Sequence, residues 1–295
     1  MNLIMGRCIV RVIHLSICPF LFESRKTGGK DGNMKRLTAM LLLLVLVLSL
    51  GACGIPKPAE GNLVEQTARN MKNLDSMGMI INLSCTAGVE GLSLPAELNM
   101  KCETILEPFQ FHLDAKVGMM GMGFPLAFYV NQEEPMTVIA LGMDMGQGME
   151  WETGLEEIPP LGELNDLSEL LPVLAAMAGE PAQEKMEGRK VYTYRVKLDR
   201  ETLERMLDGE LPEGAEPMFQ ALLEQMPQDA SLPLSFSIDP EEKLLRGLAL
   251  DLSQMMEGLA VDAMGAEVSD VVLTISYDDF NQISEIRIPA EAFAS

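Results

Sequence analysis

Apolar and polar residues alternate along three consecutive stretches of the chain between residues 79 and 117. A period of two places successive side chains on opposite faces of a β-strand. One face of each stretch is apolar and the other is mostly polar, which predicts an antiparallel meander that is wetted on one side. The apolar positions are Met79, Ile81, Leu83, Cys85 and Ala87; Ala96, Leu98, Met100, Cys102 and Thr104; and Phe109, Phe111, Leu113, Ala115 and Val117.

Further strands and a few helices are predicted along the rest of the chain. The strand-like stretches are 125–130, 136–141, 149–153, 189–199, 232–238, 244–252, 269–278 and 283–292. Apolar residues at helical spacing predict helices over 60–77, 163–178, 200–207 and 217–226. Asp199 is placed to cap the third of these helices. Turn residues occupy 239–242 and 278–281. The fold class is therefore α+β, with an antiparallel sheet and a few covering helices.

An export signal is predicted upstream of the meander. Lys35 and Arg36 precede an uncharged apolar run, Ala39 to Leu50, which is too short to span a bilayer. Leu50-Gly51-Ala52-Cys53 then resembles the bacterial lipobox, whose cysteine takes up diacylglycerol and a fatty acid such as palmitate. This resemblance implies that Cys53 is lipidated and begins the mature chain. The alternative is an ordinary signal peptide with a chance cysteine.

Four segments are expected along the chain. Residues 1–33 fit no targeting pattern and are interpreted as an upstream extension assigned by a wrong start, or alternatively as a long n-region. Residues 34–53 form the signal and lipobox, and 54–62 form a tether with two prolines. Residues 63–295 are then expected to form one β-rich domain.

Charge excludes some partners. Removal of residues 1–53 changes 22 basic and 44 acidic residues to 15 and 42, a formal charge of −27. Such a chain should be repelled by nucleic acid and by anionic membrane surfaces. Contact with a membrane must therefore come from the lipid anchor, on the outer face of the bacterial cytoplasmic membrane. Protein partners are not indicated by the sequence.

Catalytic chemistry is not indicated either. His112 is the one histidine after residue 53, and its strand parity with Asp114 and Lys116 predicts that it faces water. A lone histidine does not supply a nucleophile-activating pair or a histidine-rich metal site. The sequence has no nucleophile elbow, zinc-protease motif or phosphate-binding loop. A non-enzymatic protein without cofactor or metal is therefore expected.

A disulfide is predicted between Cys85 and Cys102. A hairpin centred between Ser93 and Leu94 would place the two cysteines opposite each other and keep apolar residues facing apolar ones. Directly opposed residues of an antiparallel pair lie within disulfide reach, and an extracytoplasmic location permits oxidation. The alternative is two buried free thiols acting as small hydrophobes.

Methionines are concentrated between residues 119 and 149 and alternate there with glycines. Thioether clusters bind Cu(I), but they also line adaptable apolar grooves or fill cores, and without nearby His or Cys the apolar roles are favoured. The alternative is that this methionine- and glycine-rich segment forms a mobile loop at the rim of the sheet. The candidate groove residues are Met119, Met120, Met122, Met143, Met145, Leu167 and Leu171.

The order of helix, long meander, helices and second meander resembles the lipoprotein-carrier-like fold of the LolA and LppX group. A weak closing pattern, Ile286-Arg287-Ile288-Pro289-Ala290-Glu291-Ala292, is similar to that of uncharacterised Gram-positive lipoproteins of this type. The resemblance implies a curved half-barrel that holds a lipid or another apolar ligand in its groove. The alternative is a structural or interaction lipoprotein whose groove is plugged by its own helices.

Overall fold

The computed structural model describes most of the chain beyond residue 61. The described residues are 62–89, 92–119, 122–133, 136–144, 146, 148–156, 170–209, 211, 216–256, 260–261 and 266–293. The predicted signal and lipobox, and the predicted tether up to residue 61, lie outside these described residues.

In the described part of the chain, twelve strands form one antiparallel sheet. Along the chain they are β1 (Ser76–Val89), β2 (Leu92–Ile105), β3 (Gln110–Met119), β4 (Met122–Glu133), β5 (Met136–Asp144), β6 (Met149–Glu156), β7 (Ala182–Met186), β8 (Arg189–Asp199), β9 (Ser231–Asp239), β10 (Leu244–Asp251), β11 (Ala260–Val261) and β12 (Ala266–Asp278).

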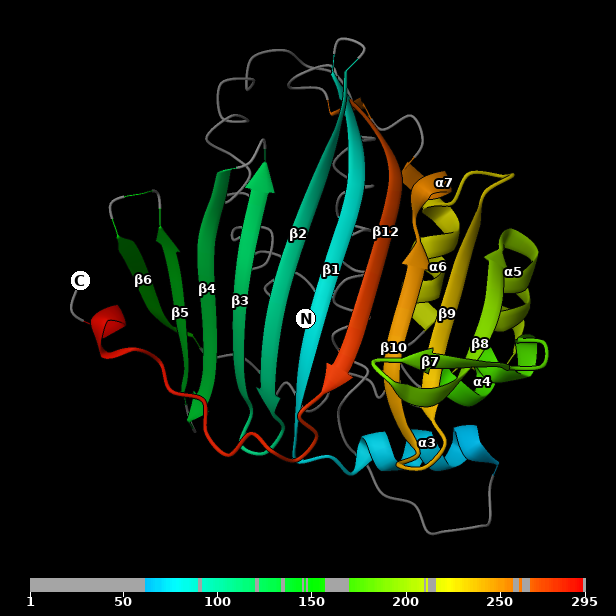
Figure 1. Cartoon of the computed structure of the whole chain (residues 1–295), viewed down its shortest axis with the longest axis horizontal. Coiled ribbons are helices and arrows are strands. Elements are labelled where there is room, and N and C mark those ends of the chain that lie inside the picture. Colours follow the sequence, from blue (N-terminus) through cyan, green and yellow to red (C-terminus); the bar gives the residue numbers. More distant parts are fainter. Residues whose placement is uncertain are drawn as a thin grey trace.

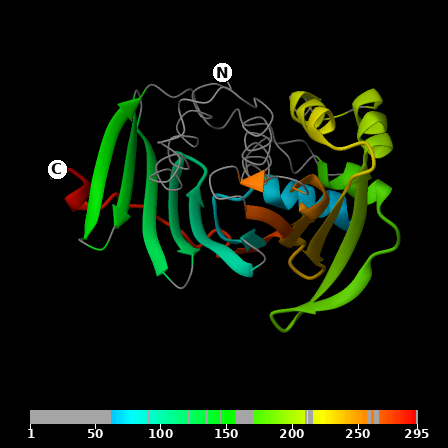
Figure 2. The same ribbon diagram turned by 90° about the horizontal axis from the view of Figure 1, so that it is seen from above.

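The spatial order of the strands is β6-β5-β4-β3-β2-β1-β12-β10-β9-β8-β7, with β11 beside β12 (Figure 1). Strand β12 therefore joins two meanders, one made of β1 to β6 and the other of β7 to β10. The sheet is strongly curved and its two described edges, β6 and β7, do not pair (Figure 2). This confirms the predicted α+β fold with an unclosed half-barrel sheet.

Five α-helices of the described residues accompany the sheet, and a short 3-10 helix, η3 (Ala290–Phe293), follows near the end of the chain. Figure 2 shows α3, α5 and α6 on the concave side of the sheet. In Figure 1, β7 crosses in front of the sheet on the opposite, convex side. The α-helices are α3 (Leu63–Lys72), α4 (Leu170–Met177), α5 (Arg200–Asp208), α6 (Glu216–Gln225) and α7 (Ser253–Met256).

The hydrophobic core lies between the concave face and these helices. Met79, Phe236 and Ile275 of the sheet are almost fully buried there, as are Met71 of α3 and Leu203 of α5. Burying one such side chain contributes about 1.5 to 3 kcal/mol relative to leaving it exposed. The alternation in the sequence is confirmed, because Met79 and Ile81 are buried whereas Ile80 between them is exposed.

The closing strand predicted over 283–292 is wrong. After β12 the chain turns through Asp279 and Asn281, which both adopt left-handed backbone conformations. Both edges of β12 are already paired, with β1 and β10, so the following segment has no free edge beside it. The segment runs along the lower edge of the sheet instead, and η3 contacts β5 and β6 (Figure 1).

The helix predicted over 60–77 is shorter than expected, and β7 was not predicted. Helix α3 ends at Lys72, so residues 76 and 77 belong to β1. Strand β7 is short, and its middle residues are polar and exposed on both faces, so it lacks the alternation that would mark a half-buried strand.

The cap on α5 is confirmed and supports a stability prediction. Asp199 accepts hydrogen bonds from the Thr202 backbone N–H at 2.9 Å and from its hydroxyl at 2.7 Å. Both hydrogen bonds lower the pKa of Asp199, and the bond from the Thr202 hydroxyl has the larger effect. The Asp199→Ala substitution should therefore reduce the free energy of unfolding by about 1 kcal/mol at neutral pH.

The pH dependence of this loss has a definite sign. A carboxylate with a lowered folded-state pKa stabilises the fold above its ordinary pKa, and this contribution is lost as the pH falls through the folded-state value. The difference between wild type and Asp199→Ala should therefore shrink below about pH 4. Urea denaturation at several pH values measures it. Asp208→Ala, at the other end of the same helix, removes a charge without removing a cap and should cost little.

Candidate functional site

The concave face of β1 to β5 carries a continuous set of half-buried apolar side chains. Directly opposed pairs include Leu83 with Leu98 and Leu113 with Phe128, and the rings of Phe111 and Phe128 meet edge to face at 6.2 Å. All of these residues pack against the buried core rather than belonging to it. The set, here called the apolar concave face, comprises Leu83, Cys85, Leu98, Phe111, Leu113, Phe128, Leu141 and Met143.

The other half of the concave side is covered by helices. Helices α4 and α5 contact β8, α3 contacts β10, and α7 contacts β9 and β12. Leu171 of α4, Leu203 of α5 and Phe219 of α6 are buried in this half. The main contacts of the described helices are therefore with β8 to β12, away from the apolar concave face.

The predicted groove residues are distributed over both halves. Met143 belongs to the apolar concave face, whereas Leu171 is buried in the core under α4. Met119 and Met122 oppose each other where β3 and β4 meet. Met120, Met145 and Leu167 lie outside the described residues. Of the seven, Met143 is the one whose described side chain contributes to the apolar concave face.

The hairpin register predicted for the two cysteines is wrong. Val89 pairs with Leu92, so Cys102 lies opposite Met79 and Cys85 lies opposite Ala96. Cys85 is six residues from Met79 along β1, which is about 20 Å at 3.3 Å per residue. Both cysteines are free, and burial raises the pKa of the Cys102 thiol to about 12. The structure therefore does not contain the predicted disulfide.

His112 does not simply face water, although it lies on the convex face as its parity predicted. Its side chain is 15% exposed, and its ring stacks on Tyr129 with centroids 4.2 Å apart. Its Nδ1 lies 3.4 Å from a Glu103 oxygen and its Nε2 lies 3.2 Å from an Asp114 oxygen. Because the neighbouring strands bring Tyr129 and Glu103 beside it, and its own strand supplies Asp114, the imidazole is largely covered.

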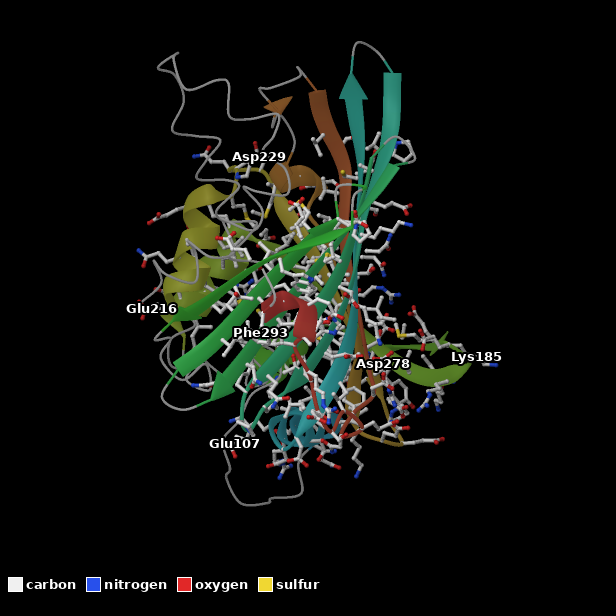
Figure 3. The ribbon with its side chains drawn as sticks, turned by 90° about the vertical axis from the view of Figure 1, so that its left-hand side faces the viewer. Glu107, Lys185, Glu216, Asp229, Asp278 and Phe293 are labelled. Atoms are coloured by element: carbon white, nitrogen blue, oxygen red, sulfur yellow. The ribbon has the colours of Figure 1, made fainter. Side chains whose placement is uncertain are left out.

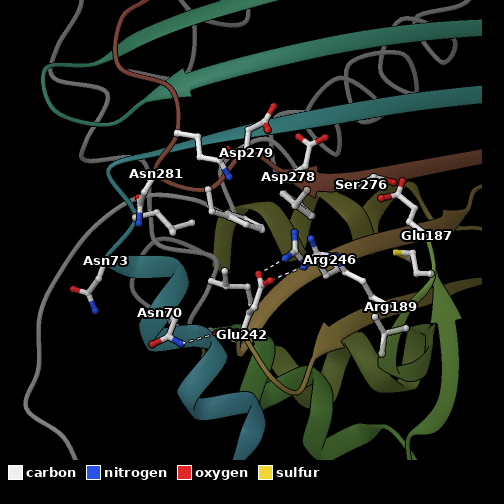
Figure 4. Close-up of a pocket in the computed structure, with 17 residues that line it drawn as sticks. Asn70, Asn73, Glu187, Arg189, Glu242, Arg246, Ser276, Asp278, Asp279 and Asn281 are labelled. Atoms are coloured by element: carbon white, nitrogen blue, oxygen red, sulfur yellow. Dashed lines mark hydrogen bonds and ion pairs between the residues drawn. The ribbon is translucent and has the colours of Figure 1, made fainter.

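A polar pocket of about 530 Å³ lies at the base of the sheet (Figure 4). This volume is in the range of small-molecule sites. Figure 3 shows Asp278 on the same side of the sheet as Lys185 of β7, opposite Glu216 and Asp229. The basal pocket is lined by Asn70, Asn73, Leu74, Met186, Glu187, Arg189, Val191, Glu242, Leu244, Arg246, Ser276, Tyr277, Asp278, Asp279, Phe280, Asn281 and Gln282.

The two arginines of the basal pocket are held in an ion-pair network. Arg189 and Arg246 both pair with Glu242, and each also approaches Asp239, at 3.8 and 3.7 Å. The register of β10 shifts at Arg246, and such a bulge redirects a side chain. The Arg246 guanidinium lies 4.9 Å over the Phe280 ring. Positive charge in the pocket is therefore already neutralised by protein carboxylates.

Three other carboxylates of the basal pocket have no such partner. Among the described residues, the side chains of Glu187, Asp278 and Asp279 form neither hydrogen bonds nor ion pairs. Burial raises the pKa of Asp278, and the charges of Asp279 and Glu187 raise it further, whereas the weaker influence of Lys101 and Arg246 lowers it. The unmatched charge of this pocket is therefore negative.

Sequence reasoning missed the basal pocket because its residues come from distant parts of the chain. The predicted turns at 239–242 and 278–281 are confirmed as turns. Both turns follow strands that end at the same edge of the sheet. The acidic turn residues were therefore the one feature of the sequence that could have indicated this pocket. Glu187 belongs to the β7–β8 hairpin, which was not predicted.

Two kinds of feature are absent from the described residues, a metal site and a membrane-spanning helix. No group of three or more His, Cys, Asp or Glu residues in this part of the chain is arranged to hold a metal ion. No described helix is both long and apolar enough to cross a bilayer. Cys53, the predicted lipidation site, lies outside the described residues.

Comparison with known proteins identifies one family and several distant structural likenesses, two of which are described below. The sequence profile of a family of unknown function, DUF6612, matches residues 60–295. No curated protein matches the chain. A DUF1329 family protein from Desulfovibrio piger has 7% identity and a TM-score of 0.24, over 77% of this chain and 92% of that one. A LolA superfamily protein from Nitrosomonas europaea has 7% identity and a TM-score of 0.22, over 78% and 95%. The fold description therefore rests on the sheet and helices themselves.

Proposed function

Because the chain belongs to DUF6612, a family of unknown function, over residues 60–295, we propose its role from its own surfaces. We infer that it is a non-enzymatic lipoprotein that binds a lipid or another apolar molecule on the apolar concave face. Its site would be extracytoplasmic, on the outer face of the bacterial cytoplasmic membrane.

The observation that carries this proposal is that the described helices cover the two halves of the concave side unequally. Leu98, Leu113, Phe128 and Leu141 face the inside of the half-barrel and are only partly buried. The described helices pack mainly on the other half of the sheet. Each methylene group that a ligand buries there contributes about 0.8 kcal/mol, so about ten would contribute roughly 8 kcal/mol before the cost of immobilisation.

The proposed anchor is a lipid on Cys53. One acyl chain binds a membrane only marginally, whereas the two or three chains of a lipidated cysteine hold a protein stably. The formal charge of −27 after Cys53 disfavours direct binding to an anionic surface. A ligand-binding domain tethered in this way would exchange apolar molecules close to the membrane.

A second candidate is a structural or interaction lipoprotein without a ligand. The observation in its favour is that Leu171, Leu203 and Phe219 of the helices already fill half of the concave side. Native mass spectrometry of residues 54–295 purified from cells, followed by organic extraction, separates the two. A co-purified apolar mass that leaves on denaturation supports binding. A clean mass that takes up no added lipid supports the interaction role.

The Leu98→Trp substitution tests the location of the ligand. The larger indole would occupy part of the apolar concave face, and we expect binding of a fluorescent fatty acid to weaken about fivefold or more. The matched control is Asn99→Trp, because Asn99 is the next residue of β2 and is exposed on the convex face. Equal affinities of the two folded variants, checked by thermal denaturation, would place the ligand elsewhere.

A further inference from the structure

The basal pocket is separate from the apolar concave face. Asp278 is paired with Gly78, whereas the next pair, Met79 with Tyr277, is buried in the core on the concave side. Because successive residues of a strand face opposite sides, Asp278 faces the convex side. All lining residues of the basal pocket belong to the described part of the chain.

We propose that the basal pocket is a second binding site, and that it takes a small alkylamine with more than one ammonium group. Ammonium groups would lie against Asp278, Asp279 and Glu187, and the methylene chain would lie against the apolar side chains of the lining. This site does not depend on the ligand proposed for the concave face.

The charges of the basal pocket favour a cation over an anion. Arg189 and Arg246, the positive groups of the lining, are engaged by Glu242 and by Asp239. An incoming anion would have to displace these carboxylates. An incoming ammonium group meets three carboxylates that form no hydrogen bond or ion pair with a described residue. Lys101 and Arg246 act on the two aspartates only through longer-range Coulombic attraction. An opposite charge within about 4 to 6 Å favours the ionised form of a carboxylate.

The backbone beneath these carboxylates is shaped to accommodate them. A Cβ atom at Gly78 would lie 2.5 Å from Oδ1 of Asp278 and 3.4 Å from Oδ2 of Asp279. Glycine therefore lets both carboxylates lie directly over β1, where a larger residue would displace them. In Figure 4, Asp278 and Asp279 lie side by side at the end of β12, with Glu187 approaching from the β7–β8 hairpin.

The spacing of the carboxylates favours an organic amine over a metal ion. No three acidic groups in the described part of the chain approach one another closely enough to hold a metal. The two adjacent aspartates can meet one ammonium group and Glu187 another, which suits a ligand whose charges are separated along a chain. Met186, Leu244 and Phe280 supply apolar contacts for methylene groups between those charges.

Calorimetric titration of residues 54–295, which retain every described element, tests the proposal. The probes are putrescine and spermidine, with 1,4-butanediol as a neutral match and glutarate as an anionic one. We expect spermidine to bind at one site per chain, and neither butanediol nor glutarate to bind. Binding should weaken several-fold between about 50 and 300 mM salt, because exposed charges are screened.

The decisive comparison is between two variants that lose the same number of charges. The double variant that combines Asp278→Asn and Asp279→Asn should weaken spermidine binding about tenfold or more. Glu216→Gln with Asp229→Asn removes two carboxylates from the opposite side of the sheet (Figure 3) and should change it less than twofold. Glu187→Gln, at the exposed hairpin tip, provides a milder variant should the double variant fold poorly.

Three results would overturn the proposal. Equal weakening in both double variants would show binding to the general acidic surface. Absence of saturable binding by either amine would show that the pocket has no such ligand. Displacement of spermidine by an equal concentration of Mg²⁺ would show that the site selects divalent charge and not an alkylamine.

Discussion

The Cys53→Ala variant is expected to leave the membrane fraction almost completely. Residues 34–53 resemble an export signal and lipobox, and the proposed function places a lipid on Cys53. Without the thiol no acyl chain is attached, and an acidic domain has no other strong attraction to an anionic bilayer. Fractionation of bacterial cells that express the full chain, followed by immunoblotting, measures the redistribution.

The matched control for this variant is Cys85→Ala. Cys85 is a free cysteine on β1, so its loss should leave membrane attachment unchanged. Intact-mass measurement of the wild type should also show a diacylglycerol-sized addition on a chain that begins at Cys53. Continued membrane association of Cys53→Ala would refute the anchor.

The Phe236→Ala variant should lose about 3 to 5 kcal/mol of unfolding free energy. Phe236 is completely buried in β9, and its ring stacks on Tyr194 with centroids 4.9 Å apart. Truncation removes apolar surface from the core and leaves a cavity that neighbouring strands on both sides prevent from closing. Urea denaturation measures the loss, which corresponds to roughly 10 °C in melting temperature for a domain of this size.

Phe293→Ala is the control for this prediction. Phe293, in η3, is 59% exposed, so the same truncation should change stability by less than about 0.5 kcal/mol. A small loss at Phe236 together with a comparable loss at Phe293 would contradict the placement of β9 in the core.

The faces of the strands could be predicted from the sequence, but not their register. Alternation decides which side chains point inward, and the buried Met79, Ile81 and Met100 confirm it. Shifting a hairpin by an even number of residues keeps every side chain on the same face. The predicted turn at 93 and 94 and the observed pairing of Val89 with Leu92 differ by such a shift. The apolar pattern therefore fits both registers equally.

The residues of the hairpin turns indicate the strand register, which the alternation of apolar and polar residues does not. The β7–β8 hairpin turns through Glu187 and Gly188, which both have positive φ, as in a two-residue type I′ connection. The same dipeptide, Glu90-Gly91, separates β1 from β2 in the sequence. A hairpin turn placed at Glu90-Gly91, instead of one centred between residues 93 and 94, would have predicted the observed register.

The basal pocket could not be predicted by local patterns. Asn70, Glu187, Arg246 and Asp278 come from four elements, and their proximity follows from the strand order rather than from spacing along the chain. The order places the C-terminal strand beside the first strand, which no periodicity indicates. The concave face, in contrast, follows from the alternation itself.

The position of β12 also constrains how the protein reaches its folded state. Its pairing with β1, for example of Tyr277 with Met79, closes a loop that spans nearly the whole domain. Contacts of such high sequence separation form slowly, because the entropy of closing the loop opposes them until most of the chain is in place. A chain still emerging from the ribosome would have two meanders and no strand to join them. Under the proposed export, that delay would postpone closure of the whole domain, as passage through a secretion channel requires.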